Sequence, residues 1–118
     1  MNILKLEEGL RVTGRSGRMY FFKEYFFHRS QFPRIMQEAG IYLFLRKKND
    51  GKYYPVFAGQ SSDLSNFSVW TLNKQWIGGR KPNRLCILPI SDQEEQNRVI
   101  HDILENPKYD FLTASNLK

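Results

Sequence analysis

The chain has 118 residues, of which 41% are hydrophobic, and its formal net charge is +6. This length supports one modest hydrophobic core, so we expect a single domain over residues 1–118. No stretch approaches the roughly 18 apolar residues of a membrane-spanning helix, and acidic residues interrupt the start of the chain where a secretory signal is apolar. A cytoplasmic protein without a membrane partner is therefore expected.

The excess of positive charge comes from the part of the chain before residue 92. Residues 1–91 hold 15 Lys and Arg against 6 Asp and Glu, whereas residues 92–118 hold 3 against 6. The excess of basic residues in residues 1–91 suits a polyanionic partner such as nucleic acid, because Lys and Arg bind phosphate whatever the base sequence. Ordinary solubilising charge has the same composition, and both interpretations stay open.

The first elements expected are two strands, over residues 10–14 and 19–27, joined by a turn at Gly14–Gly17. The second strand contains the run MYFFKEYFF, in which aromatic residues and alternation favour extended structure. We expect these rings to enter the core, although rings exposed for base stacking have the same composition. Residues 1–38 carry no motif and are expected to add strands to a core formed by residues 39–110, or alternatively to carry the binding specificity.

A β-hairpin is expected next, from strands over residues 41–48 and 52–59. The turn between them contains Asn, Asp and Gly, which tolerate positive φ. Pro55 cannot donate a ladder hydrogen bond, so the second strand is interrupted there or lies at a sheet edge. A helix is then expected, with its buried face beginning at Leu64. Three side chains can cap its first turn: Ser61, Ser62 and Asp63.

The last predicted elements are a buried strand over residues 84–90 and a helix over residues 92–105. The lone Cys86 lies in the strand and is expected to be a core residue, not a nucleophile. Ser91 and Glu94 match a capping box at the start of the helix. The expected fold class is α+β, an α/β sandwich in which a small, mostly antiparallel central sheet is flanked by helices.

The middle of the chain carries an ordered set of short motifs. Gly-Ile-Tyr at 40–42 opens the hairpin, Phe-Ala-Gly at 57–59 closes it, Gly-Gln-Ser-Ser-Asp-Leu follows at 59–64, and Pro-Lys-Tyr-Asp occupies 107–110. Over residues 39–110 this set resembles the GIY-YIG nuclease family. The resemblance implies a GIY-YIG-like fold and cleavage of nucleic-acid phosphodiesters with a divalent cation, commonly Mg²⁺.

The resemblance also implies where catalytic groups would lie. In the family, a Tyr on the second strand helps to activate water, an Arg on the next helix stabilises the phosphate, and a later Glu holds the metal. Matched position by position, Tyr42 of the first motif is kept, but the second Tyr falls on Phe57. The Arg falls on Phe67, or on Asn66 if one residue is deleted, and the Glu falls on Gln96. A catalytically impaired member of the family is therefore expected, with no confident catalytic residue.

Neighbouring side chains are possible substitutes for the missing groups, and Arg80, Lys81 or Arg84 could replace the Arg at a phosphate. Glu95 neighbours Gln96, but one step along a helix turns its side chain about 100° away from the inward face. Tyr42 is the available base. An atypical active metal-dependent endonuclease is therefore a second alternative. We expect no metal site and no cofactor, with Mg²⁺ required only for residual nuclease activity.

The leading hypothesis is that the former substrate groove binds nucleic acid without cutting it. Its predicted contacts are Arg46, Lys47, Lys48, Lys74, Arg80, Lys81, Arg84 and Trp70. The alternative is a protein-binding pseudo-nuclease that acts as a subunit, regulator or inhibitor. Convergence of the basic residues around the hairpin favours nucleic acid, whereas scattered charges and an exposed apolar patch favour a protein. The sequence does not determine the oligomeric state or distinguish DNA from RNA.

Overall fold

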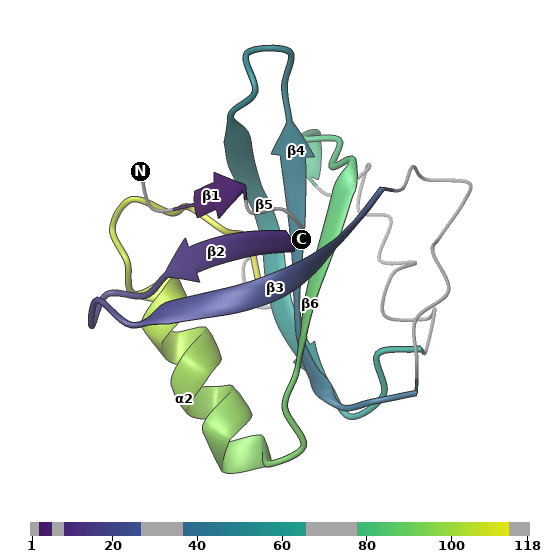
Figure 1. The fold of residues 1–118 in the computed structure, drawn as a ribbon, viewed down its shortest axis with the longest axis vertical. Helices are drawn as coiled ribbons and strands as arrows, with labels where there is room; N and C mark the ends of the chain where they lie inside the picture. The colour runs from purple at the N-terminus through teal and green to yellow at the C-terminus, as the bar shows by residue number, and fades with distance from the viewer. Residues whose placement is uncertain (1–2, 6–8, 27–36, 66–77, 114–118) are drawn as a thin grey trace.

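The computed structural model describes residues 3–5, 9–26, 37–65 and 78–113. In this part of the chain, one six-stranded sheet packs against one helix, so the fold class is α+β and strands dominate it (Figure 1). The elements are β1 (Ile3–Lys5), β2 (Gly9–Thr13), β3 (Met19–Phe26), β4 (Gly40–Lys47), β5 (Tyr53–Ser61), β6 (Arg84–Pro89) and α2 (Gln93–Leu104).

The strands are arranged in the order β1-β2-β3-β6-β4-β5, and all five neighbouring pairs are antiparallel. The last strand in the chain, β6, therefore lies between β3 and β4 and joins the first three strands to the β4–β5 hairpin. In Figure 1, β2 and β3 run across the view while β4 and β6 stand upright, which reflects a strong sheet twist. The predicted strands and hairpin are confirmed, and Gly51 in the hairpin turn has a φ of 82°.

The irregular part of the hairpin lies at Pro55, as predicted. Strand β5 is at the edge of the sheet, and its pairing register with β4 shifts between Phe44 and Leu45. Phe44 faces Phe57, but Leu45 faces Pro55, so Val56 is an extra residue in the ladder. This bulge accommodates a residue that cannot donate a hydrogen bond.

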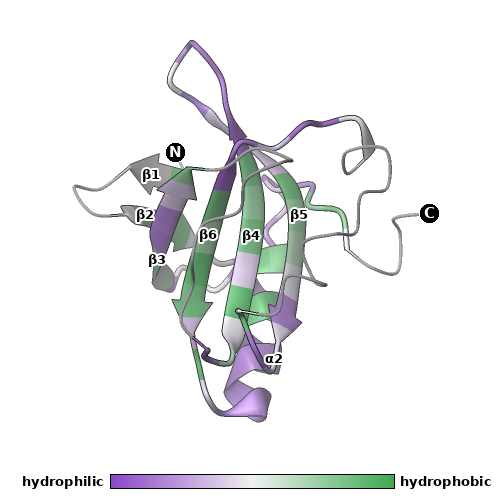
Figure 2. Ribbon diagram, turned by 90° about the vertical axis from the view of Figure 1, so that its right-hand side faces the viewer, coloured by the Kyte–Doolittle hydropathy of each residue, from purple (hydrophilic) through white to green (hydrophobic). Residues whose placement is uncertain are grey.

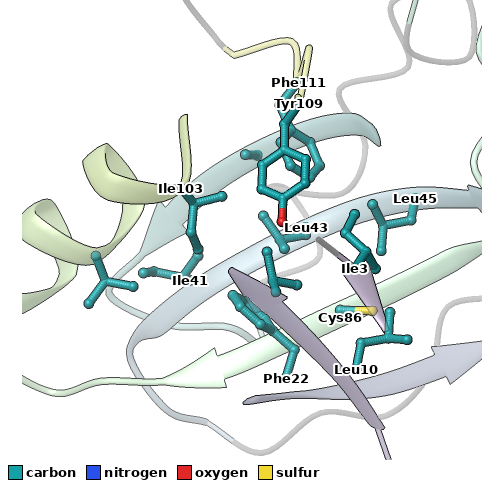
Figure 3. Packing of buried hydrophobic residues seen from close by; sticks show 13 residues of the cluster. Ile3, Leu10, Phe22, Ile41, Leu43, Leu45, Cys86, Ile103, Tyr109 and Phe111 are labelled. Atoms are coloured by element: carbon teal, nitrogen blue, oxygen red, sulfur yellow. The ribbon is translucent and has the colours of Figure 1, made fainter. Parts of the chain in front are cut away.

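One face of the sheet, which we call the helix face, packs against α2 (Figure 3). Because strand side chains alternate, every second residue of the central strands enters this core. Cys86 is fully buried here, which confirms its prediction as a core residue. The buried members include Leu10, Val12, Phe22, Ile41, Leu43, Leu45, Cys86, Val99 and Ile103.

The intervening residues form a second cluster on the opposite face. Figure 2 shows hydrophobic colour along β4, β5 and β6, with α2 behind the sheet. The buried members of this cluster are Tyr42, Phe44, Val56, Phe57, Leu64, Leu85 and Ile87. The tyrosine of the Gly-Ile-Tyr motif and Phe57 therefore lie on the face of the sheet that does not contact α2.

The predicted cap of the last helix is wrong by one residue. Asp92, not Ser91, is the N-cap: its backbone is extended, and its side chain accepts a hydrogen bond from the Glu94 backbone N–H at 3.4 Å. The helix itself is confirmed, because Val99 and Ile103 are buried one turn apart. A carboxylate at this position also interacts favourably with the helix dipole, which a serine hydroxyl does not.

The aromatic strand β3 enters the core only in part, which corrects the expectation that its rings are buried together. Phe22 is buried and Tyr20 packs against the same cluster. Phe21 and Phe26 are 57% and 75% exposed. Alternation explains the difference at Phe21, because adjacent strand residues point to opposite faces and the outer part of the opposite face is exposed around β3.

The segment after Gly59 begins differently from the prediction. Strand β5 continues to Ser61, and Asp63 then accepts hydrogen bonds from the Ser65 backbone N–H at 2.9 Å and from its hydroxyl at 2.6 Å. Leu64 is buried, as predicted. The remainder of the predicted helix, residues 66–77, lies outside the described residues. Within the described residues, α2 is the one helix beside the sheet.

Candidate nucleic-acid interface

A basic groove lies where the β4–β5 hairpin meets the segment that precedes β6. Its volume is about 450 Å³, and we call it the basic groove. It brings together four of the predicted nucleic-acid contacts, Arg46, Lys48, Arg80 and Lys81. The full lining is Arg46, Lys48, Tyr54, Pro55, Val56, Gly79, Arg80, Lys81 and Asp110. Positions more than 30 residues apart in the chain therefore contribute charge to one surface.

Backbone carbonyl groups hold both guanidinium groups of the groove. Arg46 Nη1 donates to the Lys81 carbonyl oxygen at 2.7 Å. Arg80 Nη1 donates to the carbonyl oxygens of Asp110 at 2.7 Å and Pro55 at 3.2 Å. Its side chain also lies 3.5 Å from the exposed Asp110 carboxylate. Each guanidinium has five N–H donors, so these bonds orient the group and leave further donors for an anion.

An aromatic ring completes the groove. Tyr54 is 37% exposed, and the Lys48 ammonium lies 4.5 Å from the centre of its ring. The Tyr54 hydroxyl donates to Asp50 at 3.0 Å, and this hydrogen bond raises the pKa of the phenol. A neutral ring beside cationic groups is the combination that holds a base by stacking and its phosphate by charge.

Two other predicted contacts lie elsewhere. Lys47 extends over the Tyr53 ring, with its ammonium 5.3 Å from the ring centre. Arg84 forms an ion pair with Glu24 at 3.2 Å, and the two side chains are only 14% and 6% exposed. The Arg84 guanidinium also lies 4.0 Å from the centre of the Phe26 ring. Its charge is therefore balanced within the protein. The remaining predicted positions, Phe67, Asn66, Trp70 and Lys74, lie outside the described residues.

The structure brings Tyr42 and Phe57 together. Their rings are buried and nearly parallel, with centroids 6.1 Å apart. Burial raises the pKa of Tyr42 to about 12. A phenol with this pKa is a weak candidate for a general base near neutral pH, because its deprotonated form is scarce. Space beside it is tight, since a Cβ added at Gly59 would clash with the Tyr42 hydroxyl.

Gln96 and Glu95 do not lie with this pair. Gln96 is buried on the inward side of α2, as its position predicts, and its Nε2 donates to the Ile90 carbonyl oxygen at 2.6 Å. Because α2 packs on the helix face, the sheet separates Gln96 from Tyr42. Glu95 is exposed and pairs with Arg98 at 3.3 Å. A neutral, internally bonded amide and an outward carboxylate do not fit the position implied for Mg²⁺.

Two polar groove residues, Tyr54 and Asp110, were not among the predicted nucleic-acid contacts. The sequence held a usable signal for Tyr54: adjacent strand residues point to opposite sides of a sheet, so Tyr53 and Tyr54 cannot share one face. Asp110 gave none, since its contact with Arg80 depends on where the chain runs after α2. Among the residues that the structure describes, His, Cys, Asp and Glu form no group of three or more that could hold a metal ion.

Within the described ranges, no helix could cross a bilayer, since α2 has only 12 residues and a charged outer face. Comparison of the chain with protein-family models, curated proteins and solved structures finds no match. Its function therefore has to be inferred from its own residues and their geometry.

Proposed function

We propose that this chain is a nucleic-acid-binding domain that does not cleave its ligand. The observation that carries the proposal is the convergence of Arg46, Lys48, Arg80 and Lys81 in the basic groove. Four cations against one lining carboxylate, that of Asp110, leave an excess of positive charge. A polyanion gains affinity at such a site by releasing its condensed counterions.

The arginine and lysine side chains of the groove differ in how they are held, and this difference supports the proposal. The two guanidinium groups are held by carbonyl oxygens, so their orientation is set before a ligand arrives. Lys48 and Lys81 are exposed and can follow a mobile backbone. Tyr54 offers a ring beside them for a base.

We propose that the chain does not cleave nucleic acid, because other residues occupy the positions at which the GIY-YIG pattern implies catalytic groups. Phe57 has no hydroxyl, Tyr42 is buried, and Gln96 lies across the sheet. Losing one group that stabilises a transition state commonly lowers a rate by about 10²- to 10³-fold, and here several are replaced. We therefore propose a GIY-YIG-like scaffold whose chemistry is impaired, with no resident metal.

A salt titration tests the binding. The affinity for short single- and double-stranded DNA and RNA is measured by fluorescence anisotropy between 25 and 300 mM salt. About four phosphate contacts predict a slope of about −3 for a single strand and about −3.6 for a duplex in a plot of log affinity against log salt. Removing two exposed cations, in Lys48→Ala/Lys81→Ala, should lower the affinity and reduce the slope by about half, since two contacts remain.

The matched control removes the same charge elsewhere. Arg15→Ala/Arg98→Ala deletes two exposed cations whose partners, Glu105 and Glu95, form weak surface pairs. The control should retain the salt slope of the unaltered protein. An absence of binding at low salt, or a slope that falls equally in both double variants, contradicts the groove proposal.

A cleavage assay tests the impaired chemistry. Incubation of the protein and nucleic acid with Mg²⁺ or Mn²⁺ should yield no cleavage. Cleavage that is abolished by Tyr42→Phe and by Glu95→Gln would contradict the proposal.

Exposed apolar side chains favour a second candidate, a protein-binding pseudo-nuclease that serves as a subunit, regulator or inhibitor. Phe21 and Phe26 expose more than half of their surface, and Met19 is 51% exposed. Such side chains are enriched at protein interfaces. The same titrations separate the candidates, because a domain specialised for protein partners has no salt-dependent affinity for DNA or RNA.

A further inference from the structure

The outer part of the opposite face carries an aromatic side chain between cations. Arg11 of β2 pairs directly with Phe21 of β3, and Thr13 pairs with Met19. Lys23 follows Phe21 on the same side of β3. We call Arg11, Thr13, Met19, Phe21 and Lys23 the aromatic–basic strip.

Strand alternation shows that these side chains share one face. Leu10, Val12 and Phe22 enter the cluster on the helix face, so the residues between them point away from α2. Tyr25, the next residue of this series, packs against the cluster on the opposite face. The Lys23 ammonium lies 5.4 Å from the Tyr25 ring centre. Phe21 therefore projects from the middle of a strand, beside a cation on each strand.

Among the described residues of β2 and β3, the charges on the side of Phe21 have one sign. Glu24 is the one acidic residue of β2 and β3, and it belongs to the alternate positions that face the other side. Its carboxylate is already engaged by Arg84 at 3.2 Å and by the Tyr53 hydroxyl at 2.9 Å. The strip is thus complementary to a polyanion that presents flat apolar faces.

We propose that the aromatic–basic strip is a stacking surface for the unpaired bases of single-stranded nucleic acid. The inference rests on the proposed function and narrows its ligand class. An unpaired base can lie on the Phe21 ring while its flanking phosphates approach Arg11 and Lys23. In a duplex the faces of the bases are covered by stacking on their neighbours, so no base face is available to the Phe21 ring.

The immediate neighbours of Phe21 favour this ligand over a protein. Protein interfaces are depleted of Lys at their centres and place apolar groups together. Phe21 instead has Arg11 opposite and Lys23 two residues away, and Met19 is its apolar neighbour on the same side of β3. Sequence-tolerant single-strand binding uses this combination of ring and flanking cations.

The test compares two exposed phenylalanines of the same strand. Binding of a fluorescent 12-nucleotide single strand and of a blunt duplex is measured for Phe21→Ala, Phe21→Tyr and Phe26→Ala. Phe21→Ala should weaken single-strand binding by about tenfold, the order expected for one lost stacked base, and leave duplex binding unchanged. Phe21→Tyr keeps the ring and should retain affinity. Phe26→Ala removes a more exposed ring at an alternate position and should also retain it.

The outcomes separate this inference from the proposed function. If Phe21→Ala binds single strands normally while Lys48→Ala/Lys81→Ala binds weakly, the strip is not a stacking surface, and the groove proposal stands. If no nucleic acid binds at low salt, both fail. Sedimentation velocity at the assay concentration adds a third outcome. Self-association that Phe21→Ala abolishes would assign the strip to a protein interface and overturn the inference.

A second measurement does not depend on the variants folding. Ultraviolet crosslinking of the unaltered protein to the single strand, followed by peptide mass spectrometry, should identify a crosslink on the peptide containing Phe21. Crosslinks confined to other aromatic residues contradict the inference.

Thermal unfolding of each variant accompanies the binding data. The transition temperature of Phe21→Ala should match that of the unaltered protein because the ring is exposed.

Discussion

At the level of single residues, the role of a basic side chain depends on what it contacts. Arg46 and Arg80 are held by carbonyl oxygens at the basic groove, and the one carboxylate near them, that of Asp110, pairs with Arg80 at an exposed position. Arg84 belongs to the same stretch of sequence as Arg80, but its charge is neutralised by Glu24 in a mostly buried pair. Arg84 therefore belongs to the framework of the protein.

Replacing Arg84 should affect stability far more than binding. Arg84→Ala leaves the Glu24 carboxylate buried without its cation, and breaking such a pair from one side costs about 3 kcal/mol. The free energy of unfolding, measured by urea denaturation, should fall by this order. Nucleic-acid affinity at a temperature where the variant is folded should stay within about twofold of the starting value, because exposed contacts are unchanged.

Two comparisons sharpen this prediction. Lys48→Ala should show the reverse pattern, with lower affinity and unchanged stability. The double variant Glu24→Gln/Arg84→Met removes both charges and should recover part of the lost stability. If Arg84→Ala instead lowers the nucleic-acid affinity as Lys48→Ala does, and leaves the free energy of unfolding unchanged, then Arg84 contacts the ligand.

At the level of elements, one carboxylate joins α2 to the β2–β3 turn. Asp102 accepts hydrogen bonds from the Ser16 backbone N–H at 2.9 Å, the Ser16 hydroxyl at 2.7 Å and the Tyr20 hydroxyl at 2.7 Å. Its carbonyl oxygen also accepts from the Arg15 N–H at 2.9 Å. Burial acts to raise the pKa of Asp102, but the hydrogen bonds outweigh it and hold the pKa below its usual value.

This contact predicts a pH-dependent stability. Because the folded-state pKa lies below the unfolded value of about 3.9, the stabilisation is complete above that pH and is lost as the pH falls through the folded pKa. Asp102→Asn should lower the free energy of unfolding at pH 7 by about 1–2 kcal/mol, the order of a hydrogen bond to a charged group. Urea unfolding curves at pH 7, 5 and 3 measure the difference.

The control lies on the outer side of the same helix. Glu94→Gln also removes a negative charge from α2, but at an exposed position, so its stability should stay close to that of the unaltered protein. The gap between the Asp102→Asn protein and the unaltered protein should narrow at pH 3. A gap that is constant from pH 7 to pH 3 would contradict the role of the Asp102 charge.

At the level of the whole molecule, β6 unites the two halves of the sheet. It pairs with β3 on one side and β4 on the other, so its removal would separate β1–β3 from the hairpin. Cys86 lies in this central strand and is fully buried. Its thiol therefore reports on opening of the whole sheet.

Thiol labelling tests this cooperative role of β6. Since the chain has one cysteine, modification by a thiol reagent measures exposure of Cys86 alone. Labelling of the native protein should be about 1,000-fold slower or more than in denaturant, because only opened molecules expose the thiol. A Cys86→Ala/Ser62→Cys protein, with its thiol at an exposed position, should react at once. Equal rates for the two native proteins would contradict a buried central strand.

Much of the fold could be predicted because its signals are local. The alternation in β2 and β3, the residues of the hairpin turn and the stripe on α2 depend on neighbours within a few positions. The N-cap was misassigned because Ser91 and Asp92 are both competent, and the backbone conformation at the helix start selects between them. Alternation also requires Phe21 and Phe22 to face opposite sides, but does not say which face is covered.

The candidate site depended on contacts that the sequence does not reveal. By itself, the sequence determined strands β2 to β6 with their hairpin, a buried Cys86 and an excess of basic residues, since these follow from composition and short-range periodicity. The tertiary structure decided that Lys48 and Lys81 share a groove, that Arg84 pairs with Glu24, and that Phe21 is exposed. The physical reason is that β6 inserts between β3 and β4, so the partners of each side chain come from distant segments.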